Sequence, residues 1–325
     1  MMIHPAGWLF FGALTSSLFI TASASSWFVA WLGLELNLLS FVPLMLKKNS
    51  VEPSLKYFLA QALASIMIIS AISLAPSSMV SLMVICLALL LKSGAAPSHQ
   101  WLPGIVEGLS WPLIAVLLTI QKMNPLIIIF FVLKAPGLAA VLPVYIVSSA
   151  FVGSIGGLNQ TSLRKIMAYS AISHMSWLLA ALLCNSWIWL VYFTAYTLVL
   201  VCLVSLLSHS QLMSLNNLTT MNKSYLSFMT SLSIMSLGGL PPFTGFVPKF
   251  MLLPYLASSP WSVLLVPLLA STFISLFFYA RLLMASLVLS GVSHSSGISP
   301  NKMDLSLAFI NLAGLVLPPF AVLLT

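Results

Sequence analysis

Long apolar stretches follow one another along almost the whole chain, and short polar or Pro/Gly-rich connections separate them. A helix needs about 20 apolar residues to cross roughly 30 Å of hydrocarbon. The pattern therefore predicts an all-α polytopic membrane protein with about eleven transmembrane helices. We place them near residues 7–25, 27–46, 56–75, 79–109, 112–133, 137–157, 163–183, 187–208, 225–257, 261–290 and 305–324.

Two of these stretches are longer than one helix needs, and similar strings interrupt them. GAAPSHQWLP at residues 94–103 and GLPPFTGFVP at residues 239–248 both fit G-x-x-P-x-x-x-aromatic-x-P. The match predicts two broken helices in an internal repeat, with a first repeat at about 27–133 and a second at about 137–290. Alternating loops make the two broken helices run in opposite directions, so the repeat is inverted. Paired interruptions of this kind indicate an ion or substrate path at mid-membrane. The alternative is that each is a packing kink, because neighbouring helices can satisfy the freed backbone groups.

Composition agrees with a chain that lives in lipid. It is 60% hydrophobic and 5% charged, with a mean hydropathy of +1.11. We expect residues 1–325 to form a single membrane domain, since no stretch resembles a soluble domain. The net charge of +8 does not indicate nucleic acid, because the basic residues form no run and no basic–aromatic pattern. The three cysteines have no paired spacing and are interpreted as small hydrophobic residues.

The basic loop residues predict the orientation. Alternating the loops between the two sides places most of them together: Lys47, Lys48, Lys56, Arg164, Lys165, Lys223 and Lys302. Lys134 lies near the other side, and Glu52 and Asp304 are expected to be solvated near the basic loops. By the positive-inside rule the N-terminus is inside and the C-terminus outside. The first apolar stretch lacks the basic start of a secretory signal, so we expect it to be a retained helix.

Four charged residues lie inside the predicted spans: Glu35, Lys92, Lys122 and Lys249. Each costs roughly 2.5 to 3.5 kcal/mol at the bilayer centre, so each is a functional candidate. One carboxylate cannot neutralise three ammonium groups, which suits the row to gaining and losing protons. Snorkelling to the surface is an alternative that fits Lys134 but fits Lys122 and Lys92 poorly.

Two histidines are candidate links in the same path. His99 lies in the first interruption, and His174 lies in the helix reading MAYSAISHMSW. Imidazole titrates in the physiological range, which suits a proton relay. The alternative is that each histidine has no role in proton transfer and simply forms a hydrogen bond with a neighbouring backbone group.

Several strings carry a resemblance to a known family. They are WLGLELNLLSFVPLM, LKYFLAQALAS, LLKSGAAPSHQWLPGIVEGL, QKMNP, GGLNQTSLRKIMAYSAISHMSW and IMSLGGLPPFTGFVPKF. In order and spacing they resemble the subunit 2 family of NADH:ubiquinone oxidoreductase, respiratory complex I, over about residues 27–285. That family belongs to the antiporter-like subunits, which also include large subunits of multi-subunit sodium/proton antiporters.

The resemblance implies roles for the charged residues. Glu35 in GLELN matches the glutamate that pairs with the lysine of the first broken helix, and Lys92 in LLKSG is that lysine. Lys122 in QKMNP matches the central lysine and Lys249 in GFVPK the terminal one. Glu107 matches a further family position, for which we expect at most an access role. The implied fold has two inverted five-helix repeats, and the chain resembles the animal mitochondrial form, which has lost N-terminal helices.

The resemblance further implies a proton-translocating subunit in the mitochondrial inner membrane, with its N-terminus in the matrix and its C-terminus in the intermembrane space. NAD, FMN, iron–sulfur clusters and ubiquinone would bind elsewhere in the complex. This chain has no Gly-rich dinucleotide loop and no cysteine set for a cluster, so we expect no cofactor or metal in it. The expected partners are other membrane subunits, including neighbouring antiporter-like ones, and lipids.

Two other interpretations of the sequence remain open. An independent secondary cation/proton antiporter would show the same repeats. A passive scaffold that has lost its pump would also have the fold, although the presence of all four buried charges argues against it.

Overall fold

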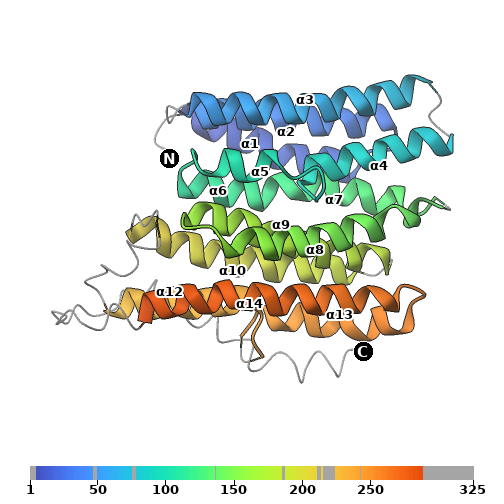
Figure 1. Ribbon diagram of the computed structural model, residues 1–325. Helices are drawn as coiled ribbons and strands as arrows, with labels where there is room; N and C mark the ends of the chain where they lie inside the picture. Colours follow the sequence, from blue (N-terminus) through green and yellow to red (C-terminus); the bar gives the residue numbers. More distant parts are fainter. Residues whose placement is uncertain are drawn as a thin grey trace. The chain divides into compact units, whose positions relative to one another are not determined.

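The computed structural model describes residues 5–46, 50–74, 78–135, 137–184, 187–210, 214, 224–241 and 243–287 (Figure 1). Over these ranges the chain is helical, with one isolated bridge between Ser162 and Ser214. The N-terminal helices are α1 (Pro5–Ala22), α2 (Trp27–Leu46), α3 (Val51–Leu74), α4 (Met79–Ser93), α5 (Trp101–Val106), α6 (Trp111–Leu118) and α7 (Ile120–Val132). The later ones are η1 (Leu138–Ala140), α8 (Leu142–Leu158), α9 (Leu163–Leu183), α10 (Ile188–Ser210), α12 (Ser224–Gly238), α13 (Phe246–Ser258), η2 (Ser262–Leu264) and α14 (Leu265–Leu287).

The all-helical prediction is confirmed, and each predicted span before residue 291 matches one helix or a consecutive pair. Seven helices in the described ranges are long and apolar enough to cross a membrane, and several shorter apolar helices accompany them. The predicted span at 305–324 lies outside the described residues.

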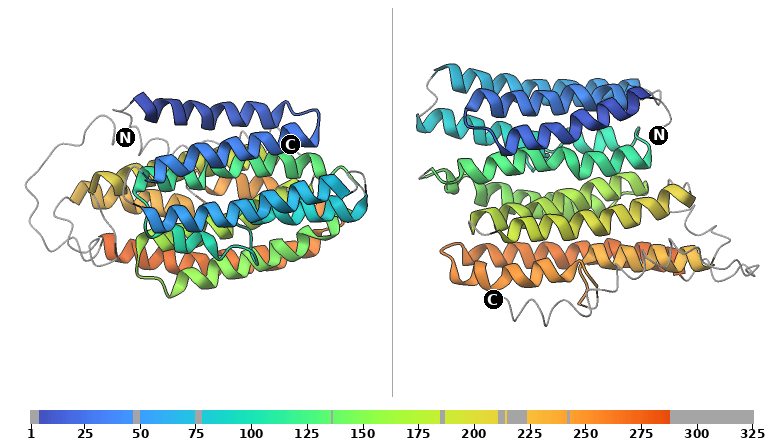
Figure 2. Two further views of the ribbon diagram at one scale, coloured as in Figure 1. Left: turned by 90° about the horizontal axis from the view of Figure 1, so that it is seen from above. Right: turned by 180° about the vertical axis from the view of Figure 1, so that it is seen from behind.

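The chain separates into two compact units, one up to Tyr145 and one from Ile146. In the first unit α2 packs between α1 and α3, and α4 packs against α3 and α7. The views in Figure 1 and Figure 2 show these helices running roughly parallel or antiparallel to one another. In the second unit α12 packs against α10 and α14, and α9 contacts α10, α13 and α14. Each unit contains one of the two interrupted helices.

Both predicted interruptions are present. The first separates α4 from α5, and the second separates α12 from α13. Each begins with a glycine in the left-handed region, Gly94 with φ 73° and Gly239 with φ 75°. This is the helix-ending conformation that glycine adopts without a steric penalty. The shared first glycine of the sequence motif therefore has the same backbone task in both units.

The outer faces of the helices are apolar. On α14, Val266, Phe273 and Phe277 are exposed, and on α3 Leu59, Leu63 and Ile66 are exposed. A spacing of three or four residues places such side chains on one face of a helix. These faces suit contact with lipid chains, while polar side chains gather on the buried faces.

Several serine hydroxyl groups within the helices are satisfied by their own helix. Ser17, Ser173, Ser271 and Ser275 each donate to a carbonyl three residues earlier, over 2.6 to 2.9 Å. This bond removes the cost of an unpaired donor in an apolar environment. It allows a chain rich in serine to remain helical in a membrane.

Arg281 fixes one connection in the second unit. Its Nη atoms donate to the carbonyls of Leu158 and Gln160 over 2.7 and 2.8 Å. Leu158 is the last residue of α8, so its carbonyl has no partner within the helix. The guanidinium thus holds the α8–α9 connection against α14.

Candidate functional site

The three lysines predicted to lie in the membrane interior are buried. The exposed fractions are 6% for Lys92, 3% for Lys122 and 9% for Lys249. Isolated ammonium groups are rarely buried to this degree, because desolvation is expensive without compensation. Each lysine therefore needs polar groups around it. These groups differ between the lysines of the first unit and the lysine of the second.

Lys92 lies in the last turn of α4, immediately before the first break. The partial negative charge at a helix C-terminus stabilises a cation there. Glu35 on α2 interacts electrostatically with Lys92, but the two side chains, both within the described ranges, form no direct ion pair. The described residues instead contain an exposed ion pair of 2.6 Å between Glu52 and Lys56 at the start of α3.

The Glu35 carboxylate is incompletely satisfied. Its Oε2 atom is buried and has no hydrogen-bond partner among the described residues. Such an orphan acceptor in a native structure requires an explanation, for which a catalytic role or a bridging water are the usual reasons. Glu35 thus has spare hydrogen-bonding capacity and no direct ion pair with Lys92.

Lys122 lies on α7, just after a distortion of the helix. Thr119 separates α6 from α7 with φ −113° and ψ −85°, and Pro125 follows within α7. The prediction of one continuous helix over 112–133 did not include this irregular turn. Asn124, fully buried, donates to Ser17 Oγ over 3.1 Å and ties α7 to α1.

Lys249 lies on α13, after the second break. Its side chain extends back across this break toward α12. Its Nζ donates to the Gly238 carbonyl over 3.1 Å and lies 5.9 Å from the centre of the Trp177 ring. Gly238 is the last residue of α12, so this carbonyl lacks a partner within the helix. Both broken-helix lysines therefore lie at the C-terminal end of the first half-helix, although they come from opposite sides of the break in sequence.

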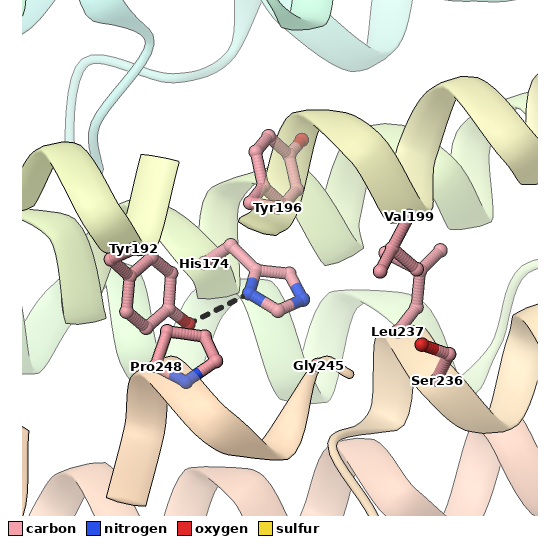
Figure 3. Close-up of a pocket in the computed structure, with 8 residues that line it drawn as sticks. All are labelled: His174, Tyr192, Tyr196, Val199, Ser236, Leu237, Gly245 and Pro248. Atoms are coloured by element: carbon pink, nitrogen blue, oxygen red, sulfur yellow. Dashed lines mark hydrogen bonds between the residues drawn. The ribbon is translucent and has the colours of Figure 1, made fainter. Parts of the chain in front are cut away.

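His174 on α9 lies in the same unit as Lys249 and is buried. Its Nδ1 atom is 2.9 Å from the Tyr192 hydroxyl, and its ring centre is 5.0 Å from that of Tyr196. Figure 3 shows the imidazole between these tyrosines of α10 and Gly245 and Pro248 of the broken helix. The Tyr196 hydroxyl is buried without a hydrogen-bond partner among the described residues.

Two water-sized cavities flank His174. The cavity of Figure 3 has about 10 Å³ of space and includes Tyr192, Tyr196 and Ser236 in its lining. The second, also about 10 Å³, is lined by Ser173, His174, Trp177, Leu237, Lys249, Ser271, Thr272, Ser275 and Tyr279. A space of this size holds about one water molecule, provided that polar partners surround it. His174 and Lys249 therefore share a polar cavity that suits one water.

Three residues considered in the sequence are more exposed than these buried groups. His99 is half-buried in the first break, with Nδ1 3.2 Å from the Pro97 carbonyl oxygen. Glu107 is exposed directly after α5, and Lys134 is exposed with its Nζ 5.1 Å from the centre of the Phe131 ring.

Sequence reasoning missed the tyrosines around His174. Tyr192 and Tyr196 are four residues apart on α10 and so lie on one helix face. Hydroxyl-bearing aromatic residues at that spacing in an otherwise apolar span were an available signal. The Gly238 carbonyl as partner of Lys249 had no such signal, because it depends on how the break folds back.

The geometry supports proton transfer by these side chains. Ammonium, imidazole and phenol groups each bind and release protons, and a water in the cavity shared by His174 and Lys249 would complete hydrogen-bonded contacts there. Among the described residues no group of three or more His, Cys, Asp or Glu side chains is placed to hold a metal ion.

Comparison with known proteins identifies the relatives of this arrangement. The family described as NADH:quinone oxidoreductase/Mrp antiporter, TM, matches residues 73–275. NADH-ubiquinone oxidoreductase chain 2 from Anopheles gambiae is 39% identical over 338 aligned residues, which cover 95% of this chain and 94% of that protein.

Solved structures share the fold at lower identity. A chain of respiratory complex I from Thermus thermophilus with bound aureothin has a TM-score of 0.78 and 22% identity, covering 98% of this chain and 78% of that one. A chain of the Mrp complex from Dietzia sp. DQ12-45-1b also has a TM-score of 0.78, with 16% identity, covering 95% of this chain and 74% of that one. Together with the broken helices and buried lysines, these matches show that the chain belongs to the NADH:quinone oxidoreductase/Mrp antiporter transmembrane family, and within it to the NADH-ubiquinone oxidoreductase chain 2 proteins.

Proposed function

We propose that this chain is a proton-translocating membrane subunit of NADH:ubiquinone oxidoreductase. In this proposal a row of proton-binding groups consists of Glu35, Lys92, Lys122 and Lys249. His174 exchanges protons with Lys249 through the cavity that the two residues share. Electron transfer from NADH to ubiquinone takes place elsewhere in the complex. Its free energy reaches the row through neighbouring subunits.

The observation that carries the proposal is the environment of Lys249. Its ammonium has a carbonyl acceptor at a broken-helix end and shares a water-sized cavity with a buried histidine. A lysine used only for packing needs no neighbouring group that titrates near neutral pH. The relatives are named NADH-ubiquinone oxidoreductase chain 2, which is why we propose that enzyme. The family description also includes antiporters, which are proteins that move ions.

We also propose the wider setting from the same relatives. The chain would reside in the mitochondrial inner membrane, with its N-terminus in the matrix and its C-terminus in the intermembrane space. It would contact other membrane subunits, among them antiporter-like neighbours, and lipids. NAD, FMN, iron–sulfur clusters and ubiquinone would bind to other parts of the complex.

We propose that residues of about 27–133 and 137–290 are the two inverted repeats. The matching left-handed glycines at the two breaks support this, as does the common position of Lys92 and Lys249 beside a half-helix end. His99 and Glu107 would then contribute access at most, since His99 is only half-buried and Glu107 is exposed.

The proposal is tested by replacing lysines that share chemistry but differ in burial. Methionine is similar in length to lysine and uncharged, so Lys122→Met and Lys249→Met remove a proton-binding group with little strain. Loss of a positioned acid–base group slows proton transfer by about 10²- to 10⁴-fold. We expect the reconstituted complex to lose this chain's contribution to the proton-to-electron ratio.

Lys134→Met is the matched control. Lys134 is exposed, and a surface charge contributes about 0 to 1 kcal/mol, so the ratio should stay at the wild-type value. Assembly of all three variants is checked on native gels. An equal loss in all three, or a loss at Lys134 alone, contradicts the buried-row mechanism.

An independent cation/proton antiporter is the second candidate, and the likeness to a chain of the Mrp complex favours keeping it. Vesicles containing the isolated chain distinguish the two. Cation-dependent proton flux without a redox reaction would support the antiporter, whereas flux that requires the assembled complex and NADH oxidation excludes it. A passive scaffold would leave the ratio unchanged in every lysine variant.

A further inference from the structure

Helix α3 has a polar buried face, which the proposed function does not use. Tyr57 and Gln61, within the string LKYFLAQALAS, are 2% and 5% exposed, while Leu59 and Leu63 on the other side are exposed. Tyr57 and Gln61 are four residues apart and therefore lie on the same face. Burying a hydroxyl and an amide is costly unless each finds a partner. Both partners lie on elements that carry a buried lysine.

Gln61 holds the end of the first broken helix. Its Nε2 atom donates to the carbonyl of Lys92 over 3.3 Å. The last four carbonyls of a helix have no partner within it. The Gly94 N–H and the Trp101 indole N–H donate to earlier carbonyls of this turn, including that of Leu91. Gln61 donates to the next carbonyl in the chain, which is that of Lys92 itself.

Tyr57 binds beside the second lysine. Its hydroxyl donates to Gln121 Oε1 over 2.7 Å, the usual length for this kind of hydrogen bond. Phe41 and Trp101 pack edge-on against the Tyr57 ring, with ring centres 5.2 and 6.0 Å away. The phenol is therefore held in one orientation.

The backbone near Gln121 is irregular, which gives the side-chain bond more importance. Thr119 breaks the helix two residues before Gln121, and Pro125 lacks the N–H that would bond to the Gln121 carbonyl. A turn with fewer backbone hydrogen bonds depends more on side chains for its geometry. Lys122 follows directly, so its direction depends on this turn.

We propose that Tyr57 and Gln61 are positioning residues: one face of α3 sets the geometry of Lys122 through Gln121 and that of Lys92 through its carbonyl. The importance of this geometry for proton transfer rests on the proposed function. The positions themselves can be tested without it.

The test places a cysteine at each lysine position in turn, Lys92→Cys or Lys122→Cys, in complex whose own Cys86, Cys184 and Cys202 are replaced by alanine. Labelling by a small membrane-permeant maleimide is followed on this chain in the assembled complex. Tyr57→Phe should change the labelling rate at position 122 roughly five- to tenfold, the factor that corresponds to one hydrogen bond. Gln61→Met should do the same at position 92. Each variant is the control for the other, and exposed Tyr255→Phe should change neither.

A double-mutant cycle gives a second measurement, which needs no cysteine background. Tyr57→Phe leaves the buried Gln121 oxygen without its donor, and Gln121→Leu removes the need for one. The thermal inactivation rate of the complex should therefore change less in the double variant than the two single effects predict together. Additive effects would show that the two residues do not act through one bond and would overturn the proposal.

The remaining outcomes also support or overturn the proposal. Unchanged labelling, or equal changes at both positions for both variants, overturns positioning by α3, because general loosening would act everywhere. With the native lysines present, we expect a reduced proton-to-electron ratio for Tyr57→Phe and Gln61→Met. Selective labelling changes with a wild-type ratio would support the positioning and count against the proposed function instead.

Discussion

At the scale of single residues, the chain stabilises its buried lysines by different means. Lys92 combines a helix C-terminus with the nearby Glu35 carboxylate. Lys249 uses the Gly238 carbonyl directly and lies near the Trp177 ring. A carboxylate can itself be protonated, whereas a carbonyl cannot. The two sites thus differ in what they can exchange, although both hold a lysine beside a half-helix end.

Glu35→Gln tests this difference. The amide keeps the shape of the side chain and removes the charge that interacts with Lys92. We expect complex that assembles normally, with reduced proton pumping and reduced coupled electron transfer, and a smaller loss than Lys122→Met because no lysine is removed. The measurement is the proton-to-electron ratio together with NADH oxidation. A variant that pumps at the wild-type ratio would make Glu35 a structural residue.

The candidate residues were predictable one by one, but their contacts were not. A charge in an apolar span is visible in the sequence, and this found Glu35 and the three lysines. Pairing depends on side-chain direction across helices. For this reason the expected close partnership of Glu35 and Lys92 appears as a longer-range interaction, and the contact between Lys249 and Gly238 was not foreseen.

At the scale of helices, the breaks were predictable because glycine and proline mark them directly. The motif glycines Gly94 and Gly239 take the left-handed conformation that the G-x-x-P pattern suggests. The break at Thr119 was not predictable, since threonine has no strong preference for ending a helix there.

Gly94→Ala and Gly104→Ala form a matched pair around the first break. Alanine at position 94 is strained by the positive φ, at a cost of about 1 to 2 kcal/mol. Gly104 lies in α5, where an added methyl group would meet open space, and alanine there should stabilise by up to about 1 kcal/mol. We expect a lower melting temperature for the first variant and an equal or higher one for the second, measured on assembled complex. The reverse order would contradict the assigned backbone of the break.

Gly239→Ala should affect function as well as stability. Its methyl group would lie 2.8 Å from Lys249 Nζ, too close for the ammonium to remain on the Gly238 carbonyl. We therefore expect a reduced proton-to-electron ratio in addition to the lower melting temperature. Gly94→Ala meets an aromatic carbon of Trp101 instead, and its effect should be confined mainly to stability.

At the scale of the whole molecule, hydropathy was sufficient to predict an all-helical membrane chain. The described helices, up to Leu287, match the predicted spans, because crossing a bilayer requires apolar segments of a set length. Orientation is a separate matter. It rests on loop charges, several of which, including Lys47, Lys48 and Lys223, lie outside the described residues.

The orientation can be measured with cysteines in the loops at 47–56 and 209–223. Both should react with an impermeant thiol reagent from the side of the N-terminus, because both carry the basic residues that stay inside. Cysteine next to Lys134 should react from the other side. Labelling of the two basic loops from opposite faces would contradict the predicted number of crossings between them.

Four hydroxyl groups in the wall of the cavity beside Lys249 have hydrogens that are already engaged. Ser173, Ser271, Thr272 and Ser275 each donate to a carbonyl of their own helix. What these groups can offer the cavity is oxygen lone pairs, which attract hydrogen atoms and repel anions. Such a wall favours an ammonium, a hydronium ion or a water molecule with its hydrogens turned outward. These four hydroxyl groups cannot pass a proton along by accepting and releasing it in turn unless a helix hydrogen bond opens first. They therefore polarise the space, while the exchange itself falls to the other polar groups of the lining, Lys249, His174 and Tyr279.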